Sequence, residues 1–179
     1  MNTTILLFHP HLKTSRVNKT LAEAAIKAGF NVRALYDIYP DEQIDVKKEQ
    51  AILESSDRIV LQFPLYWYSS PSLLKKWEDL VLEHGWAYGS TGNKLRGKEL
   101  LLAVSVGASI ADYQHDTKNY TLTELLRPFQ VTSNFIGTKY LQPFFTTSAL
   151  SISEAELKIQ ARKYINYLQE ETLVLANYE

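Results

Sequence analysis

The chain has 179 residues, of which 45% are hydrophobic and 22% charged, and its formal net charge is −1. These values are typical of one globular domain with a sizeable core, and they exclude a strong basic field that would hold the chain on nucleic acid or an anionic membrane. The chain contains no cysteine, so disulfides, thiolate ligands and cysteine nucleophiles are excluded, and redox chemistry would need a bound cofactor.

The first half of the chain alternates between strand and helix patterns. Thr3–Phe8 is a continuous apolar run, as in a strand buried on both faces. The sequence has no signal-peptide pattern and no apolar run of about 20 residues, so we expect a cytoplasmic protein. Apolar residues recur at helical spacing over Arg16–Gly29, and alternation predicts a second strand over Asn31–Tyr36. A weaker helix over Val46–Ser55 and a strand over Asp57–Phe63 follow.

The second half continues this alternation after one irregular segment. Pro71–Leu82 has an amphipathic helical pattern, whereas residues 84–97 include four glycines and predict a long surface loop. The remaining predicted elements are a strand over Leu100–Ser105, a helix over Leu122–Gln130, a strand over Ser133–Tyr140 and a helix over Ser153–Glu171.

Five strands that alternate with helices predict one α/β domain over residues 1–179. Each parallel crossover needs a covering helix, so we expect a five-stranded parallel sheet of order 2-1-3-4-5 with helices on both faces. Ligands bind such sheets beyond the carboxyl ends of the strands, where the strand order reverses, here between strands one and three. The loops after strands one, three and four therefore hold the candidate site.

The first of these loops, His9–Asn18, leads from the first strand into the first helix. Free amide groups at the start of a helix favour a phosphate, and here the Ser15 hydroxyl and the backbone N–H groups of residues 16–18 could bind one. The alternative is that Ser15 only caps the helix and that His9 is structural. The chain has neither a G-x-G-x-x-G fingerprint nor a P-loop, which leaves a monophosphate cofactor as the expected ligand.

The other two loops add aromatic and small residues to this site. Residues 66–68, in the loop Phe63–Pro71, are three consecutive aromatics that cannot all enter one core, so part of this surface should meet a planar cofactor. The alternative is that Trp67 or Tyr68 packs under the next helix. The loop after strand four begins with the small residues Ser105–Ser109, which allow the backbone to approach a ligand closely.

Together with the sequences GWAYG at 85–89 and LRPF at 126–129, these loops resemble those of the flavodoxin-like NAD(P)H dehydrogenase (quinone) family over nearly the whole chain. The nearest groups are the ancillary oxidoreductases of Kef potassium-efflux systems and the general stress quinone reductases. The resemblance implies a three-layer flavodoxin-like fold and a homodimeric NAD(P)H:quinone oxidoreductase that uses FMN, with FAD as the alternative; we expect no metal site. It implies that the cofactor is bound by His9, Ser15, Arg16, Val17, Asn18, Pro64, Leu65, Tyr66, Trp67, Tyr68, Ser105, Val106, Gly107 and Ala108.

The family also implies a mechanism, in which NAD(P)H passes hydride to flavin N5 and leaves before a quinone enters and receives two electrons. This chain has Ser-Val-Gly-Ala at 105–108 where family members often carry Thr-Thr-Gly-Gly, so we expect donors to the pyrimidine edge of the flavin from backbone N–H groups around Gly107. Tyr113 or His115 could relay the proton of the quinone, the alternative being that both are exposed loop residues. The functional alternatives are a flavodoxin-type electron carrier and a regulatory partner of a potassium-efflux protein at the inner face of the membrane.

Overall fold

The computed structural model describes residues 1–114 and 120–176, and in this part of the chain strands and helices alternate. The described elements are β1 (Thr3–Leu7), η1 (Leu12–Thr14), α1 (Val17–Lys27), β2 (Asn31–Ala34), α2 (Leu35–Ile38), α3 (Val46–Ser55), β3 (Arg58–Pro64), α4 (Ser72–Val81), β4 (Glu99–Ser105), η2 (Ile110–Asp112), α5 (Leu122–Leu125), α6 (Arg127–Ile136), β5 (Lys139–Tyr140), β6 (Phe144–Thr146) and α7 (Glu154–Gln169), where η1 and η2 are short 3-10 helices.

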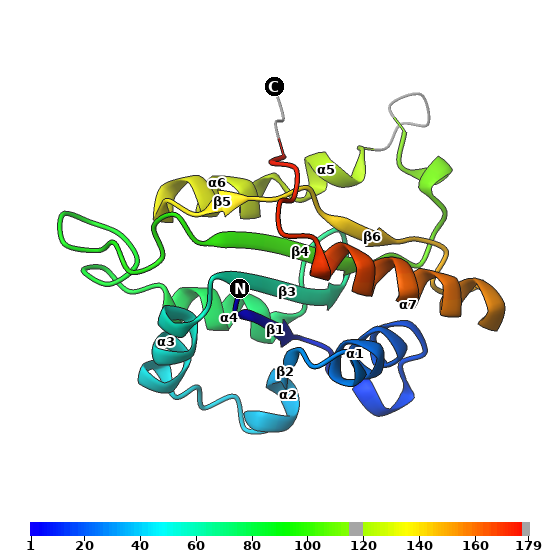
Figure 1. Cartoon of the computed structure of the whole chain (residues 1–179), viewed down its shortest axis with the longest axis horizontal. Helices are drawn as coiled ribbons and strands as arrows, with labels where there is room; N and C mark the ends of the chain where they lie inside the picture. Colours follow the sequence, from blue (N-terminus) through cyan, green and yellow to red (C-terminus); the bar gives the residue numbers. More distant parts are fainter. Residues whose placement is uncertain (115–119, 177–179) are drawn as a thin grey trace.

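The strands form one parallel sheet in the order β2-β1-β3-β4-β5, with β6 as a sixth strand that also pairs with β4 (Figure 1). The predicted fold class and the predicted order 2-1-3-4-5 are therefore confirmed. Chain order reverses between β1 and β3, so the loops that follow these two strands open side by side at the carboxyl edge of the sheet.

Two apolar cores lie on opposite faces of this sheet. Successive strand residues point to opposite faces, so Ile5 packs toward α1 and α7, whereas Leu6 packs toward the face covered by α3, α4 and α6. All residues of β1 and β3 are buried, as expected for central strands covered on both sides. The rigid three-layer sandwich fixes the strand ends that carry the loops.

The prediction of a strand over Ser133–Tyr140 is wrong for most of the segment, and only its last two residues, Lys139–Tyr140, form a strand, β5. This segment continues α6 as far as Ile136, and Gly137 ends the helix in the left-handed conformation with φ 75°. The buried residues of α6 are Phe129, Ser133 and Ile136, which follow a helical spacing and pack the helix on the sheet. Two short strands, β5 and β6, replace the single predicted fifth strand.

The final helix, α7, is tied to the amino edge of the sheet by a buried charge. The guanidinium of Arg58, which is 0% exposed, donates to Glu99 Oε2 at 2.6 Å and to the carbonyl oxygens of Leu168 and Glu170, each at 2.9 Å. These bonds satisfy carbonyl groups at the end of the helix, which have no partner within it. None of the described helices, α7 included, combines the length and the hydropathy needed to cross a membrane.

Candidate functional site

A cavity of about 420 Å³ opens at the carboxyl edge of the sheet, where the loops after β1, β3, β4 and β6 meet. Its size lies within the range of small-molecule sites, which is about 300 to 1,000 Å³. It is lined by His9, Thr14, Ser15, Arg16, Val17, Asn18, Pro64, Leu65, Tyr66, Ser105, Gly107, Ala149 and Leu150. The structure thus brings the predicted cofactor residues together here, apart from Trp67, Tyr68, Val106 and Ala108, which do not line the cavity.

The start of α1 presents hydrogen-bond donors to this cavity. Within the described residues, the backbone N–H groups of Arg16 and Val17 have no hydrogen-bond acceptor. Ser15 Oγ accepts the N–H of Asn18 at 3.2 Å, so Ser15 does act as a cap, but its own hydroxyl hydrogen is left to donate. Together with the positive end of the helix dipole, these groups favour an anion.

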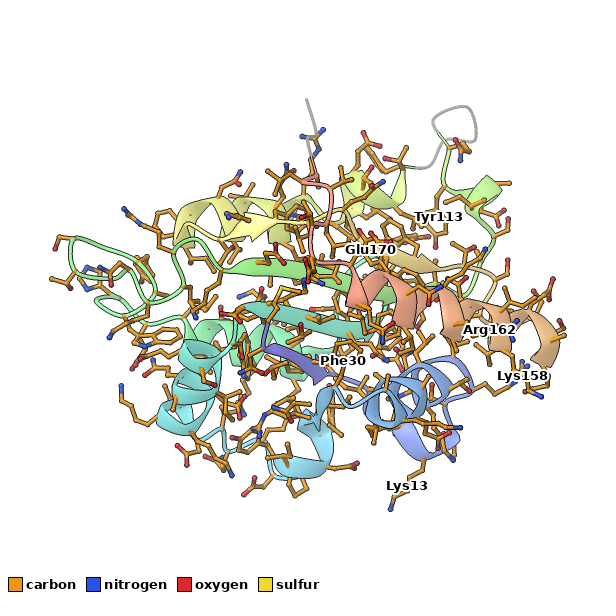
Figure 2. The ribbon with its side chains drawn as sticks, in the orientation of Figure 1. Lys13, Phe30, Tyr113, Lys158, Arg162 and Glu170 are labelled. Carbon is orange, nitrogen blue, oxygen red and sulfur yellow. The ribbon has the colours of Figure 1, made fainter. Side chains whose placement is uncertain are left out.

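The charged side chains of the first loop do not point into this donor cluster. Arg16 Nη2 lies 2.8 Å from Glu154 Oε1 and 2.8 Å from the carbonyl oxygen of Ile152, so the guanidinium is held at the start of α7. Lys13 projects from η1 away from the molecule (Figure 2). An anion in the cavity would therefore be bound mainly by backbone and hydroxyl groups.

His9 adds a neutral donor to the same wall. Its Nδ1 accepts the backbone N–H of His11 at 3.1 Å, which leaves the ring hydrogen on Nε2. Burial lowers the pKa of His9, and the nearby His11 lowers it further, so the imidazole is neutral at pH 7. The ring also stands edge-on to Tyr66, with 6.5 Å between the ring centroids.

The loop after β4 contributes mainly through its backbone. Val106 is 1% exposed, packs in the core and donates its N–H to the carbonyl oxygen of Thr146 at 2.9 Å, so the prediction that it contacts a ligand finds no support in its position. The N–H of Gly107 has no acceptor among the described residues. A Cβ atom at Gly107 would come within 3.3 Å of Leu150 Cδ1, so glycine allows Leu150 to lie close over this backbone.

The aromatic loop after β3 closes in a tight turn that holds two side chains away from the core. Tyr66 and Ser69 exchange backbone hydrogen bonds of 2.9 and 3.0 Å, and the two residues between them have positive φ, 47° at Trp67 and 60° at Tyr68. Such turns normally carry glycine, asparagine or aspartate, because a Cβ atom is strained in this conformation. Trp67 is 93% exposed and Tyr68 56%, so neither packs under α4, where the buried Trp77 lies instead.

The predicted proton-relay residue Tyr113 lies apart from the cavity lining. Tyr113 follows η2 (Figure 2), and burial raises its pKa, with smaller contributions from Tyr68 and Asp112. It is close enough to Tyr68 for their charges to interact, but it does not line the cavity. His115 lies outside the described residues.

Sequence reasoning missed Thr14, Ala149 and Leu150 as part of the cavity wall. The last two follow β6, which pairs with β4 so that Thr146 lies beside Ser105. The sequence carried a signal for this strand, because Phe144–Thr146 consists of aromatic and β-branched residues after a proline. A strand predicted there would have placed residues 147–152 at the carboxyl edge of the sheet, beside the candidate site.

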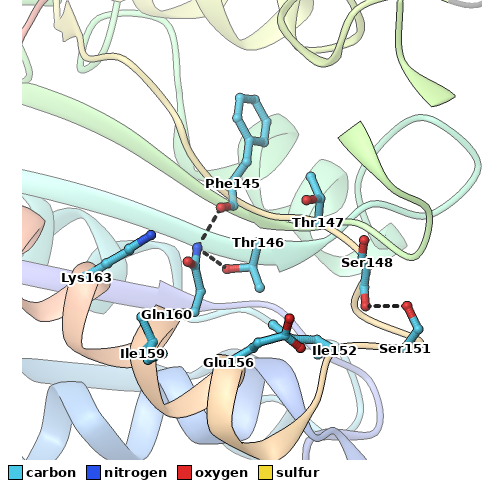
Figure 3. Close-up of a pocket in the computed structure, with 10 residues that line it drawn as sticks. All are labelled: Phe145, Thr146, Thr147, Ser148, Ser151, Ile152, Glu156, Ile159, Gln160 and Lys163. Atoms are coloured by element: carbon cyan, nitrogen blue, oxygen red, sulfur yellow. Dashed lines mark hydrogen bonds between the residues drawn. The ribbon is translucent and has the colours of Figure 1, made fainter. Parts of the chain in front are cut away.

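A second cavity, of about 470 Å³, lies between the segment after β6 and α7 (Figure 3). Gln160 spans one side of it, donating from Nε2 to the carbonyl oxygen of Phe145 at 2.8 Å and to Thr146 Oγ1 at 3.2 Å. None of the residues predicted to bind a ligand lines this cavity. We therefore place the candidate site in the first cavity. Among the described residues, no group of three or more His, Asp or Glu could hold a metal ion.

Residues 1–168 match a family model described as flavodoxin-like fold. An uncharacterized NAD(P)H oxidoreductase of Bacillus subtilis strain 168, YrkL, is 50% identical over 173 residues, which cover 96% of this chain and 99% of that protein. The glutathione-regulated potassium-efflux system ancillary protein KefF of Klebsiella aerogenes is 41% identical over 162 residues, covering 89% of this chain and 90% of that protein.

Solved structures share the fold at similar levels of identity. General stress protein 14 of Treponema denticola, determined in complex with FMN, is 41% identical with a TM-score of 0.89, covering 94% of this chain and 98% of that one. An NADPH-quinone reductase from P. pentosaceus is 31% identical with a TM-score of 0.83, covering 93% of this chain and 97% of that one.

Proposed function

Since this chain belongs to the flavodoxin-like family of NAD(P)H oxidoreductases, we propose that it is an FMN-dependent NAD(P)H:quinone oxidoreductase whose cofactor occupies the 420 Å³ cavity. The observation that carries the proposal is the arrangement of donors in that cavity. N–H groups that have no acceptor among the described residues gather with a hydroxyl at the start of α1, while exposed aromatic side chains follow β3. The FMN complex of the Treponema protein supports the choice of cofactor.

The cavity fits the chemistry of FMN at both ends. At the α1 end, the N–H groups of Arg16 and Val17, the hydroxyl of Ser15 and Nε2 of His9 would bind the phosphate dianion without placing a charged side chain against it. At the other end, Gly107 N–H and the aromatic loop would meet the planar ring. Bound FMN would supply two-electron hydride chemistry between NAD(P)H and a quinone that use the same site in turn.

This chain's own residues would orient the reactants and exclude water from the ring. Trp67 and Tyr68 stand on a turn whose backbone is held by two hydrogen bonds, so little further ordering of the backbone is needed when they contact a ligand. Tyr113, whose pKa Tyr68 also raises, stays a candidate to hold the quinone proton, because a tyrosine phenol is protonated at neutral pH. The role predicted for His115 also stays a proposal.

The experiment is a flavin spectrum followed by a two-substrate assay. The purified protein should bind FMN, become yellow, and oxidise NAD(P)H when menadione or benzoquinone is added. Rates measured against both substrates should give the parallel double-reciprocal lines of a ping-pong reaction. A protein that stays colourless and cannot be reconstituted with FMN refutes the proposal. Direct bleaching of the flavin by NADPH in stopped flow separates this enzyme from an electron carrier, which needs a reductase.

A second candidate function is supported by the KefF relative, which is 41% identical over 89% of this chain. We propose that the protein also associates with a potassium-efflux protein, which would place it in the cytoplasm at the inner face of the membrane. Co-purification with a tagged efflux protein from the same cells tests this. Efflux that is unchanged when the gene for this chain is deleted contradicts it.

The proposed homodimer has a candidate surface on α6. Val131 is 65% exposed and Phe135 68%, large fractions for apolar side chains on one helix. Sedimentation or light scattering should give twice the 20.5 kDa mass of the chain. A monomer at micromolar concentration contradicts the dimer while leaving the flavin chemistry open to its own test.

A further inference from the structure

A chain of four buried polar side chains runs from α7 to the floor of the candidate cavity. Tyr164 donates its hydroxyl to Gln62 Oε1 at 3.1 Å, and Gln62 Nε2 donates to the carbonyl oxygen of Asn18 at 3.0 Å. Asn18 Nδ2 then donates to Ser105 Oγ at 2.8 Å. Tyr164 and Gln62 are 0% exposed and do not line the cavity, whereas Asn18 and Ser105 do.

The direction of each hydrogen bond in this chain is fixed by one backbone group. A carbonyl oxygen can only accept, so the carbonyl of Asn18 requires Nε2 of Gln62 beside it, which turns Gln62 Oε1 toward the Tyr164 hydroxyl. Nε2 of Gln62 also donates to Asn18 Oδ1 at 3.4 Å. Because the oxygen of the Asn18 amide faces Gln62, its nitrogen Nδ2 faces Ser105. Ser105 Oγ is an acceptor in that bond, and no described residue accepts the hydroxyl hydrogen of Ser105.

Asn18 orients a second hydroxyl on the same wall. Its backbone N–H donates to Ser15 Oγ at 3.2 Å, so the hydrogen of that hydroxyl is also left without a described acceptor. Both serines line the cavity. With one lone pair occupied and the hydrogen without a described acceptor, each hydroxyl can donate to a ligand with phosphate or carbonyl oxygens.

We infer that Gln62 and Tyr164 are positioning residues that act through Asn18 to hold the Ser105 hydroxyl as a hydrogen-bond donor toward bound FMN. This inference rests on the proposed function, because it requires FMN in this cavity. Complete burial raises the pKa of Tyr164 well above its usual range, so the phenol that begins the chain stays protonated and donates at any working pH.

The test is a double-mutant cycle on FMN affinity between Gln62→Met and Ser105→Ala. Methionine has a similar length but cannot fix the amide of Asn18, so the Ser105 hydroxyl loses its imposed direction. We expect Ser105→Ala to raise the FMN dissociation constant about two- to tenfold, the effect of one lost hydrogen bond, and Gln62→Met to raise it by up to the same factor. In the Ser105→Ala background, Gln62→Met should have no further effect. Quenching of FMN fluorescence measures each dissociation constant.

Gln160→Met is the matched control. Gln160 also donates from Nε2 to a backbone carbonyl, that of Phe145 at 2.8 Å, but it lines the second cavity (Figure 3), so FMN affinity should not change. If Gln62→Met does not fold, Tyr164→Phe replaces it in the same cycle, because it deletes one oxygen atom and loosens Gln62 from the other end.

Two results would overturn the inference. An effect of Gln62→Met on FMN affinity that is equal with and without the Ser105 hydroxyl would show that Gln62 supports the fold and does not act through Ser105. An FMN dissociation constant that is unchanged in Ser105→Ala would show that this hydroxyl is not a donor to the cofactor. Wild-type protein that binds no FMN would refute the proposed function itself, so the two failures are distinguishable.

Discussion

Replacing Trp67 by glycine should make the protein more stable and a poorer flavoprotein at the same time. A side chain at the positive φ of 47° costs about 1 to 2 kcal/mol, which glycine avoids. Glycine also has greater conformational freedom in the unfolded chain, and this lowers the free energy of unfolding by about 0.5 to 1 kcal/mol. Because Trp67 is 93% exposed, its removal sacrifices almost no buried surface. The net stabilisation is therefore about 1 kcal/mol, or roughly 2 to 4 °C in Tm for a domain of this size.

Trp67 does not line the cavity, but the proposed function brings the aromatic loop against the flavin ring, and the same substitution would remove that contact. Aromatic pairs contribute about 0.5 to 1.5 kcal/mol beyond their buried area, so FMN affinity should fall about two- to tenfold. Thermal unfolding of the apoprotein and an FMN titration measure the two effects separately. Trp67→Ala is the control, since it also lacks the ring but keeps the strained Cβ; it should lose FMN affinity without gaining stability. An unchanged FMN dissociation constant in both variants would refute the placement of this loop against the flavin.

Two further substitutions test the electrostatics and the phosphate end. Glu78 lies in the wall of a 440 Å³ cavity between α4 and α6, and burial raises its pKa from 4.5 to about 7. Between these two pH values the folded state holds a proton on Glu78 that the unfolded state has lost, so the protein loses stability as pH rises from 4.5 to 7. Glu78→Gln should remove that loss of stability, which is about 2 to 3 kcal/mol for a partly exposed group. Denaturant unfolding at pH 5 and pH 8 measures it, and a pH dependence that the substitution leaves unchanged contradicts the raised pKa. Ser15→Ala should weaken FMN about fivefold but leave riboflavin, which lacks the phosphate, unaffected; equal weakening of both ligands contradicts a phosphate at α1.

The sequence was sufficient even for a helix with a weak apolar pattern. The helix predicted over Val46–Ser55 has those bounds in the structure, because Asp45 caps it through the N–H of Lys48 and its buried residues repeat at helical spacing. The predicted strand at 133–140 failed because an apolar pattern this short fits both periods, and the helical packing of α6 on the sheet decided between them. Local patterns therefore predicted the sheet order, but they placed the start of the fifth strand too early and missed β6.

The turn at Trp67 and Tyr68 shows a different limit. Aromatic residues disfavour positive φ, so no local preference predicts the conformation that both adopt. The exchanged hydrogen bonds between Tyr66 and Ser69, together with the sheet beneath, impose it. Strain of this kind is retained where exposed side chains must be held in one place, which is consistent with a binding role for the loop.

Asn18 illustrates why a site residue predicted from sequence needs its contacts before it can be tested. The sequence placed it on the loop as a ligand contact, and a substitution to alanine would then be expected to leave folding intact. In the structure it is 2% exposed and bonded to Gln62, 44 positions away, and to Ser105, 87 positions away. Asn18→Ala would keep the backbone carbonyl that Gln62 binds, but it would remove the buried amide between Gln62 and Ser105 at a cost of about 1 to 3 kcal/mol, so a loss of FMN in that variant would report lost stability as readily as lost binding. The proposed phosphate site is therefore better tested by substituting Ser15. The orientation of the Ser105 hydroxyl is better tested by substituting Gln62, which lies outside the cavity.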